Sequence, residues 1–121
     1  MVMDDEKIVR SVVERILKHL GYEVAMATSG TEAIDLYIQA RESGNPFTAA
    51  IMDLTIPGGM GGGEAIKRLQ EIDPDIKAIV SSGYSNDPIM ADFASFGFRG
   101  MIAKPFRLQE LAQVLQAVVE G

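Results

Sequence analysis

Short apolar runs alternate with stretches of helical periodicity along the whole chain, and this alternation restricts the fold more than any other feature. The apolar runs, which predict buried strands, lie at residues 1–3, 24–27, 49–52, 77–81 and 101–103. Apolar residues at helical spacing lie between them and after them, at 8–20, 33–38, 65–72 and 108–119, with a shorter helix expected at 88–97. Strict alternation with short connections predicts an α/β fold, a parallel sheet with helices on both faces.

Helix ends are marked by local signals. Ser29 and Glu32 have the S-x-x-E spacing of a capping box, which predicts a helix start at residue 30. Asp87 followed by Pro88 is typical of an N-cap with proline in the first helical position. Gly21 is expected to end the first helix.

Five strand–helix units of this length predict a doubly wound, flavodoxin-like sheet with the strand order 2-1-3-4-5. The first and third strands are then neighbours, and ligands of such sheets bind beyond the carboxyl ends of the strands. Asp4 and Asp5 directly follow the first strand, and Asp53 directly follows the apolar run of the third. We therefore expect three carboxylates in one crevice of a single domain, residues 1–121.

Charge and composition exclude several function classes. The net charge of −6 argues against direct nucleic-acid binding, which depends on clustered Lys and Arg. The chain has no Cys, hence neither disulfides nor thiolate metal sites, and no run of eighteen apolar residues that would predict a membrane span. Since there is also no secretion signal, we expect a cytoplasmic location, with no direct membrane contact.

The expected acid cluster needs a positive partner, because three neighbouring carboxylates repel one another. A hard cation such as Mg²⁺ meets this need, since it binds one or two carboxylates and keeps waters or substrate oxygens. Lys104, after the last strand, can bring a second positive charge, and Ser82, after the fourth strand, can bring a hydroxyl. This set of groups is suited to phosphoryl transfer, with Asp53 as the attacking nucleophile.

Each of these residues also has an ordinary explanation when it is taken alone. Ser82 can cap a turn, Lys104 can be a surface lysine before a loop proline, and Asp is common in the loops that follow strands. The functional hypothesis depends on their joint position, at the carboxyl ends of the first, third, fourth and fifth strands.

These positions resemble the marks of a known family, the receiver domain of bacterial response regulators. The order and spacing of four groups are similar: Asp4-Asp5-Glu6, Asp53 with Pro57 four residues later, Ser82-Gly83, and Lys104-Pro105-Phe106. The similarity extends over essentially the whole chain. More narrowly, the segments DLTIPGGMGG and SSGYSNDP resemble those of receivers attached to the end of hybrid sensor histidine kinases.

The resemblance implies a role in phosphorelay signal transduction. Asp53 would be the phosphoacceptor, and the donor would be a phosphohistidine on a sensor histidine kinase or a histidine phosphotransfer domain. Asp5 and Asp53 would bind Mg²⁺, Asp4 would hold the water shell of the metal, and the backbone carbonyl of Thr55 would be a further ligand. Such a domain is a phosphoacceptor rather than an enzyme, although it assists its own phosphorylation and dephosphorylation.

The resemblance also assigns the groups that respond to phosphorylation. Ser82 would bind one phosphoryl oxygen and Lys104 another, and the Lys104-Pro105 peptide bond is expected to be cis. The face built from the fourth helix, the last strand and the last helix would then change its partner binding, and it is also a candidate surface for a homodimer.

Three features depart from the family pattern. Met101 occupies the position of a usual aromatic residue that moves inward on phosphorylation, and a flexible thioether is a weaker reporter of two states. The loop after Asp53 carries an extra glycine. The first strand has only three residues before Asp4, fewer than a central buried strand should have, so we expect a domain excised from a longer protein, such as the cytoplasmic end of a sensor kinase.

Other functions on the same fold remain as alternatives. A phosphatase with an aspartate nucleophile would need a second acid two residues after Asp53, where Thr55 stands. A flavin or nucleotide carrier would need a phosphate-binding loop after the first strand, where this chain has acids. An interaction module that is never phosphorylated ranks second, and metal binding that is lost in Asp5→Ala would argue against it.

Overall fold

The computed structural model describes residues 1–83 and 87–120. Strands and helices alternate in the following order: β1 (Val2–Met3), α1 (Lys7–His19), β2 (Met26–Ala27), α2 (Gly30–Glu42), β3 (Ala50–Asp53), α3 (Gly62–Ile72), β4 (Ala78–Ser82), α4 (Pro88–Ala91), the 3₁₀ helix η1 (Phe93–Phe96), β5 (Gly100–Ala103) and α5 (Leu108–Glu120). The turn predicted around Tyr84 lies outside the described residues.

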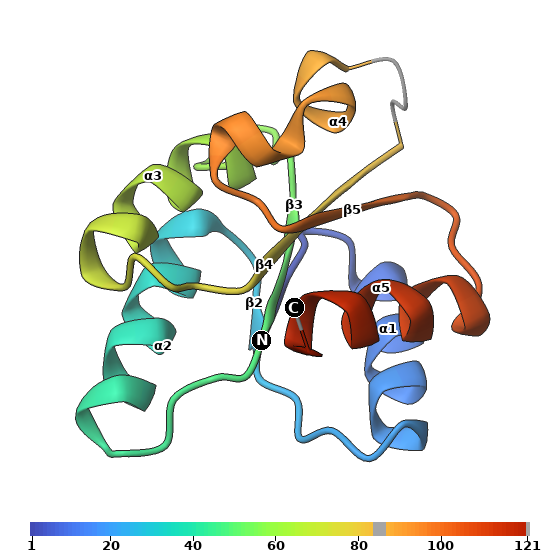
Figure 1. Cartoon of the computed structure of the whole chain (residues 1–121), viewed down its shortest axis with the longest axis horizontal. Helices are drawn as coiled ribbons and strands as arrows, with labels where there is room; N and C mark the ends of the chain where they lie inside the picture. Colours follow the sequence, from blue (N-terminus) through green and yellow to red (C-terminus); the bar gives the residue numbers. More distant parts are fainter. Residues whose placement is uncertain (84–86, 121) are drawn as a thin grey trace.

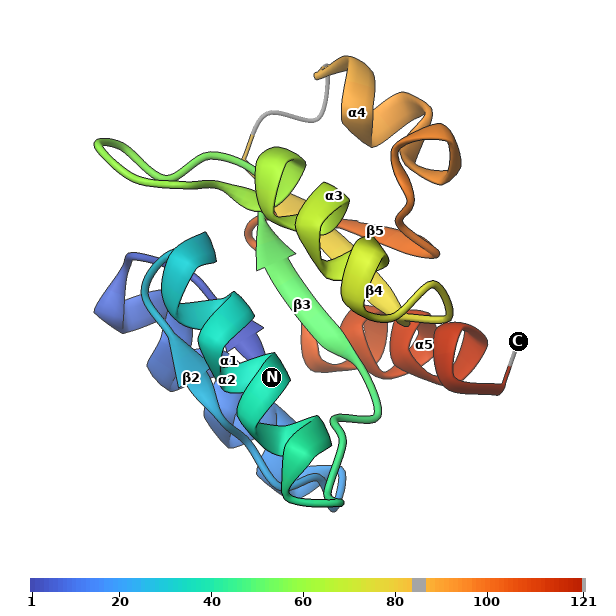
Figure 2. The ribbon, with the colours of Figure 1, turned by 90° about the vertical axis from the view of Figure 1, so that its left-hand side faces the viewer.

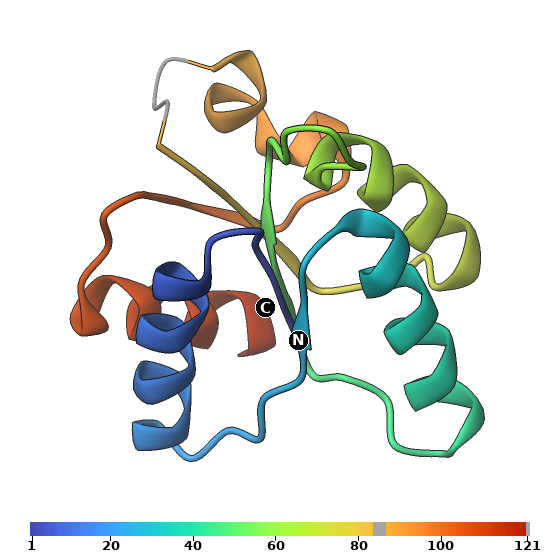
Figure 3. The ribbon, with the colours of Figure 1, turned by 180° about the vertical axis from the view of Figure 1, so that it is seen from behind.

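The five strands form one parallel sheet in the order β2-β1-β3-β4-β5, which confirms the predicted doubly wound topology. Helices α2 and α3 cover one face of the sheet, and α1 and α5 cover the other (Figure 1). Figure 2 looks onto the first of these faces, with β3 visible between α2 and α3, and Figure 3 shows the same layers from behind. The sheet therefore separates two apolar cores.

Alternate residues of the central strands supply these two cores. Met52 and Val80 pack with α2 and α3, whereas Ile51 and Ile79 pack with α1 and α5. All four are at most 4% exposed. Because both faces of the strands are buried, the apolar runs of the sequence are continuous rather than alternating. This burial holds the carboxyl ends of the strands, where Asp53 lies, in fixed register.

Several element boundaries differ from the sequence prediction. The strand expected at 24–27 is confined to β2, and the predicted fourth helix is split into α4 and η1. Helix α3 begins at Gly62, inside the glycine run, where a Cβ would lie only 2.8 Å from the Asp53 carbonyl oxygen. Ile8 and Val12 were expected on the buried face of α1 but are 79% and 45% exposed.

The far ends of α2 and α3 are joined by a polar contact. The Tyr37 hydroxyl donates to Asp73 Oδ2 at 2.7 Å, and Arg41 forms an ion pair with the same oxygen at 3.0 Å. The hydrogen bond from Tyr37, together with the nearby guanidinium, holds the pKa of Asp73 below its usual value, although burial opposes this. The contact stabilises the layer that supports β3.

Candidate functional site

Acidic side chains from β1 and β3 meet at a single lysine. Met3 pairs with Met52 across the two neighbouring strands, so the residues that follow, Asp4 and Asp53, emerge side by side. Lys104 Nζ, just beyond β5, lies 2.6 Å from Asp4 Oδ2 and 3.4 Å from Asp53 Oδ2. The geometry expected from the strand order is therefore present, with the lysine bridging both carboxylates.

A pocket of about 400 Å³ opens above this bridge at the carboxyl ends of the strands. It is lined by Asp5, Glu6, Asp53, Thr55, Pro57, Ser82, Gly83 and Lys104. Five of the six predicted site residues thus share one pocket. The sixth, Asp4, is 3% exposed and does not line the pocket, but it contacts Lys104 and Glu6, which do.

Oxygens of Asp4 accept three hydrogen bonds, and its backbone N–H donates to the Ala27 carbonyl at 3.0 Å. Its Oδ1 accepts a hydrogen bond from the backbone N–H of Glu6 at 2.9 Å, while Oδ2 accepts from Lys104. Its backbone carbonyl accepts from the Arg10 guanidinium at 2.8 Å. The contact of Arg10 with Asp4 was not predicted, because nothing in the local sequence distinguishes a basic residue in the first turn of an amphipathic helix that binds a backbone carbonyl from one that faces solvent.

Asp53 is a buried carboxyl, 6% exposed, at the end of β3. Burial raises its pKa to about 6, the positive charge of Lys104 opposes this, and the charges of Asp4 and Asp5 add to it. Burial acts to lower the pKa of Lys104 as well, but the hydrogen bond to Asp4 and the charge of Asp53 outweigh it and raise that pKa. At neutral pH the Asp53 carboxyl is therefore mostly ionised and lies beside the ammonium group of Lys104.

The donor atoms of the pocket fit a hard divalent cation. Carboxylate oxygens of Asp4, Asp5 and Glu6 lie within 4.8 Å of one another, and Asp5, Asp53 and Thr55 line the same pocket. All of these donors are oxygens, which Mg²⁺ prefers. Glu6 is not among the metal ligands predicted from the sequence, yet its carboxylate also belongs to this cluster.

Ser82 ends β4 on the wall of the pocket and is 2% exposed. Its backbone carbonyl accepts a hydrogen bond from the N–H of Lys104 at 2.9 Å, which ties the end of β4 to the end of β5. The Lys104-Pro105 peptide bond is cis, as the family resemblance implied. The hydroxyl and the ammonium group are thus fixed on adjacent strand ends.

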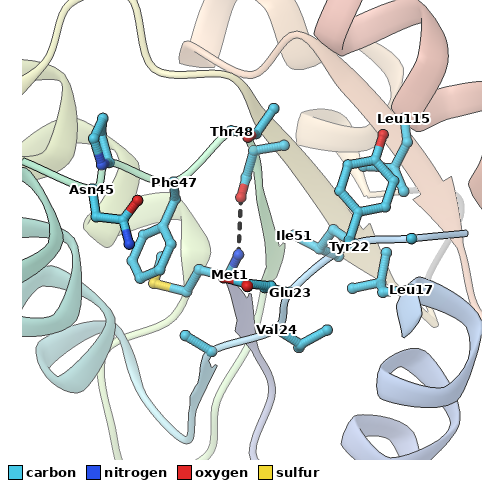
Figure 4. Close-up of a pocket in the computed structure, with 14 residues that line it drawn as sticks. Met1, Leu17, Tyr22, Glu23, Val24, Asn45, Phe47, Thr48, Ile51 and Leu115 are labelled. Atoms are coloured by element: carbon cyan, nitrogen blue, oxygen red, sulfur yellow. Dashed lines mark hydrogen bonds between the residues drawn. The ribbon is translucent and has the colours of Figure 1, made fainter.

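A second pocket of about 390 Å³ lies at the opposite end of the sheet (Figure 4). The Met1 amino group donates to the Ala49 carbonyl there at 3.0 Å, and burial lowers its pKa to about 6. Among the described residues that line this pocket, only Glu23 has a charged side chain. It therefore lacks the clustered acids and the lysine that distinguish the pocket around Asp53.

None of the described helices is both long enough and apolar enough to cross a bilayer.

Comparisons with known proteins confirm the resemblance drawn from the motifs. The family model for the response regulator receiver domain matches residues 1–116. The chain is 32% identical to the chemotaxis protein CheY of Thermotoga maritima, with 98% of this chain and 94% of that protein covered. It is also 32% identical to part of the sensor kinase CckA of Brucella abortus, with 99% of this chain but only 12% of the kinase covered.

The fold has close counterparts among solved structures. One is the receiver domain of the sensor histidine kinase PA1611 of Pseudomonas aeruginosa, which was solved with a magnesium ion coordinated in its active-site cleft. The TM-score is 0.85 at 22% identity, with 99% of this chain and 95% of that chain covered.

Proposed function

This chain belongs to the response regulator receiver family and acts in two-component phosphorelay signalling, and from that premise we propose that Asp53 is its phosphoacceptor. The observation that carries the proposal is the bridge of Lys104 between Asp4 and Asp53 beneath an acidic pocket. We further propose that residues 1–121 form one receiver domain and that it works in the cytoplasm.

The transfer step uses Asp53 as an ionised nucleophile. A carboxylate oxygen of Asp53 attacks the phosphorus of a phosphohistidine, a P–O bond forms, the P–N bond breaks, and the imidazole leaves with the electron pair. Because the pKa of Asp53 is about 6, the carboxylate is ionised at neutral pH without another base. The Lys104 ammonium group then forms an ion pair with one phosphoryl oxygen, and the Ser82 hydroxyl donates a hydrogen bond to another.

The metal requirement follows from the donors around Asp53. Asp5, Asp53 and the Thr55 carbonyl would hold Mg²⁺ directly, and Asp4 would hold its water shell. When bound, the ion neutralises charge on the phosphoryl oxygens. The magnesium ion in the active-site cleft of the PA1611 receiver domain, which has the same fold, supports magnesium as the metal.

A neighbouring groove suits the phosphodonor. It measures about 490 Å³ and is lined by Ile8, Val9, Val12, Val13, Pro105 and Phe106, together with Glu6, Gly83 and Lys104, which it shares with the acidic pocket. Exposed apolar side chains beside an active pocket indicate a docking surface. We assign this groove to the helix that carries the phosphohistidine of a sensor kinase or phosphotransfer domain.

Phosphorylation would change partner binding at the face formed by α4, β5 and α5, and one such partner would be a second copy of this chain. Met101, in place of the usual aromatic residue, is partly buried and packs against the core on the α2–α3 side of the sheet. We propose that phosphorylation shifts the populations of this face by drawing Ser82 and Lys104 toward the phosphoryl group.

Incubation with Mg²⁺ and acetyl phosphate, followed by intact-mass measurement, tests the proposal. The wild type gains one phosphoryl group, whereas Asp53→Asn gains none, and chelation of the metal abolishes the gain. Asp35→Asn, on the exposed side of α2, is the matched control and labels like the wild type. Equal labelling of Asp53→Asn and wild type would refute the assignment.

A further inference from the structure

The loop between β3 and α3 is closed at its base by contacts that only glycine allows. The N–H of Gly62 donates to the Leu54 carbonyl at 3.1 Å. A Cβ at Gly62 would lie 2.8 Å from the Asp53 carbonyl oxygen, and one at Gly61 would overlap the Leu54 carbonyl. The end of the loop therefore packs directly on the strand that carries the phosphoacceptor.

The tip of the same loop is attached to a different element, the start of α2. The N–H of Gly30 donates to the Met60 carbonyl at 2.7 Å. A Cβ at Gly30 would lie 2.7 Å from Met60 Cγ and 2.9 Å from both its carbonyl oxygen and its Sδ. Gly30 is buried and does not line the acidic pocket, so this contact serves neither the metal nor the phosphoryl group directly.

Thr55 and Pro57 lie between these two attachments and line the acidic pocket. We propose that Gly30 is a positioning residue: its contact with Met60 holds the β3–α3 loop, and with it the Thr55 carbonyl, in the arrangement that binds Mg²⁺. This inference rests on the proposed function, because it concerns the same metal site.

The physical reason is preorganisation. A loop that is already held in place loses little conformational entropy when a cation binds, whereas a loop that must be ordered first subtracts that entropy from the affinity. Removing the Gly30 contact leaves every metal-binding side chain in place and alters only the freedom of the loop. Its effect should therefore appear even without metal.

Gly30→Ala is the test, with hydrogen exchange in EDTA and Mg²⁺ binding by titration calorimetry as readouts. We expect faster exchange at residues 54–61 without metal, and a Kd for Mg²⁺ raised about tenfold, equivalent to about 1.4 kcal/mol. The control within the loop is Gly59→Ala, whose Cβ would make ordinary contacts, 3.4 Å from Ile56 Cγ2 and 3.9 Å from Ser29 Cβ. It should match the wild type in both readouts.

A second control separates positioning from general loss of stability. Gly97→Ala introduces a side chain at a φ of +98° and an overlap with Gln70, away from the acidic pocket. It should lower the free energy of unfolding and leave the Mg²⁺ affinity unchanged. Met60→Ala removes the side chain that packs on Gly30 without any new overlap, and it should change exchange and affinity in the same direction as Gly30→Ala.

If Gly30→Ala folds, hydrogen exchange and a Kd for Mg²⁺ equal to those of the wild type would overturn the inference. If Gly30→Ala does not fold, the same result in Met60→Ala would overturn it. Neither result affects the role of Asp53, because phosphorylation of the wild type by acetyl phosphate is measured separately. Failure of that labelling, with loop exchange changed as expected, would refute the proposed function instead.

Discussion

Replacing Asp53 with asparagine should stabilise the metal-free protein at neutral pH. The wild type holds an ionised carboxylate in a buried position near Asp4 and Asp5, and Lys104 compensates for it only in part. An asparagine of nearly the same shape has no charge to desolvate. The substitution that abolishes phosphorylation is therefore expected to raise the free energy of unfolding, whereas replacing an aspartate with a purely structural role would lower it.

The raised pKa of Asp53 sets the size of the effect. A rise from 3.8 to about 6 is a shift of about two units, or about 3 kcal/mol of unfavourable free energy when the group is ionised. This shift already includes the ion pair with Lys104 at 3.4 Å, so the loss of that pair is not a further cost, but the asparagine amide still buries polar atoms that need hydrogen-bond partners. We expect a net gain of about 1–2 kcal/mol in the free energy of unfolding.

The pH dependence has a definite sign. Because the folded pKa of Asp53 lies above its unfolded value, the folded state binds more protons between pH 3.8 and about 6. The wild type therefore loses stability relative to Asp53→Asn as the pH rises through this window, and the difference stays constant above it. Mg²⁺ should reduce the difference, since bound metal stabilises the wild-type carboxylate.

Urea unfolding of both proteins in EDTA, from about pH 4 to about pH 8, measures this difference. Asp35→Asn serves as the control and should show no such trend. A destabilised Asp53→Asn at neutral pH, or a difference that grows as the pH falls, would refute the reasoning.

Three further predictions concern the scaffold and the docking groove. Asp73→Asn should lower the free energy of unfolding, measured by urea titration at neutral pH, by about 1–2 kcal/mol. Adding Tyr37→Phe to Asp73→Asn should lower it little further. Because the folded pKa of Asp73 is below its unfolded value, the stability difference between wild type and Asp73→Asn should fade below pH 3.8. Ser81→Ala should leave stability unchanged or raise it by up to about 1 kcal/mol, since the buried Ser81 hydroxyl has no hydrogen-bond partner among the described residues; a clear loss would contradict this. Ile8→Ser should slow phosphotransfer from a phosphohistidine donor at least about fivefold without slowing labelling by acetyl phosphate, whereas Leu108→Ser, outside the groove, should change neither.

Local patterns were sufficient to predict most of the fold. The Ser29 hydroxyl accepts from the Glu32 N–H, and Asp87 accepts from the Ile89 N–H, as their positions before helices predicted. These signals are readable because each involves residues close in sequence. The exposure of Ile8 was not predictable, since its helical spacing is the same whether the first turn of α1 faces the core or a groove beside Phe106.

The candidate site was predictable to the extent that strand order determines it. Once β1 and β3 are neighbours, Asp4 and Asp53 must approach each other, and Lys104 follows at the end of β5. The contact of Gly30 with Met60 could not be predicted, because it joins residues thirty positions apart with no periodicity between them. Such contacts depend on how a loop folds back, which spacing does not encode.

Reduction of the acetyl-phosphate-treated protein with borohydride, followed by peptide mass mapping, tests the central claim most directly. An aspartyl phosphate is reduced to homoserine, so we predict homoserine at position 53 and at no other aspartate. Homoserine at position 4 or 5, or a stable phosphate on Ser82 with residue 53 unchanged, would contradict it.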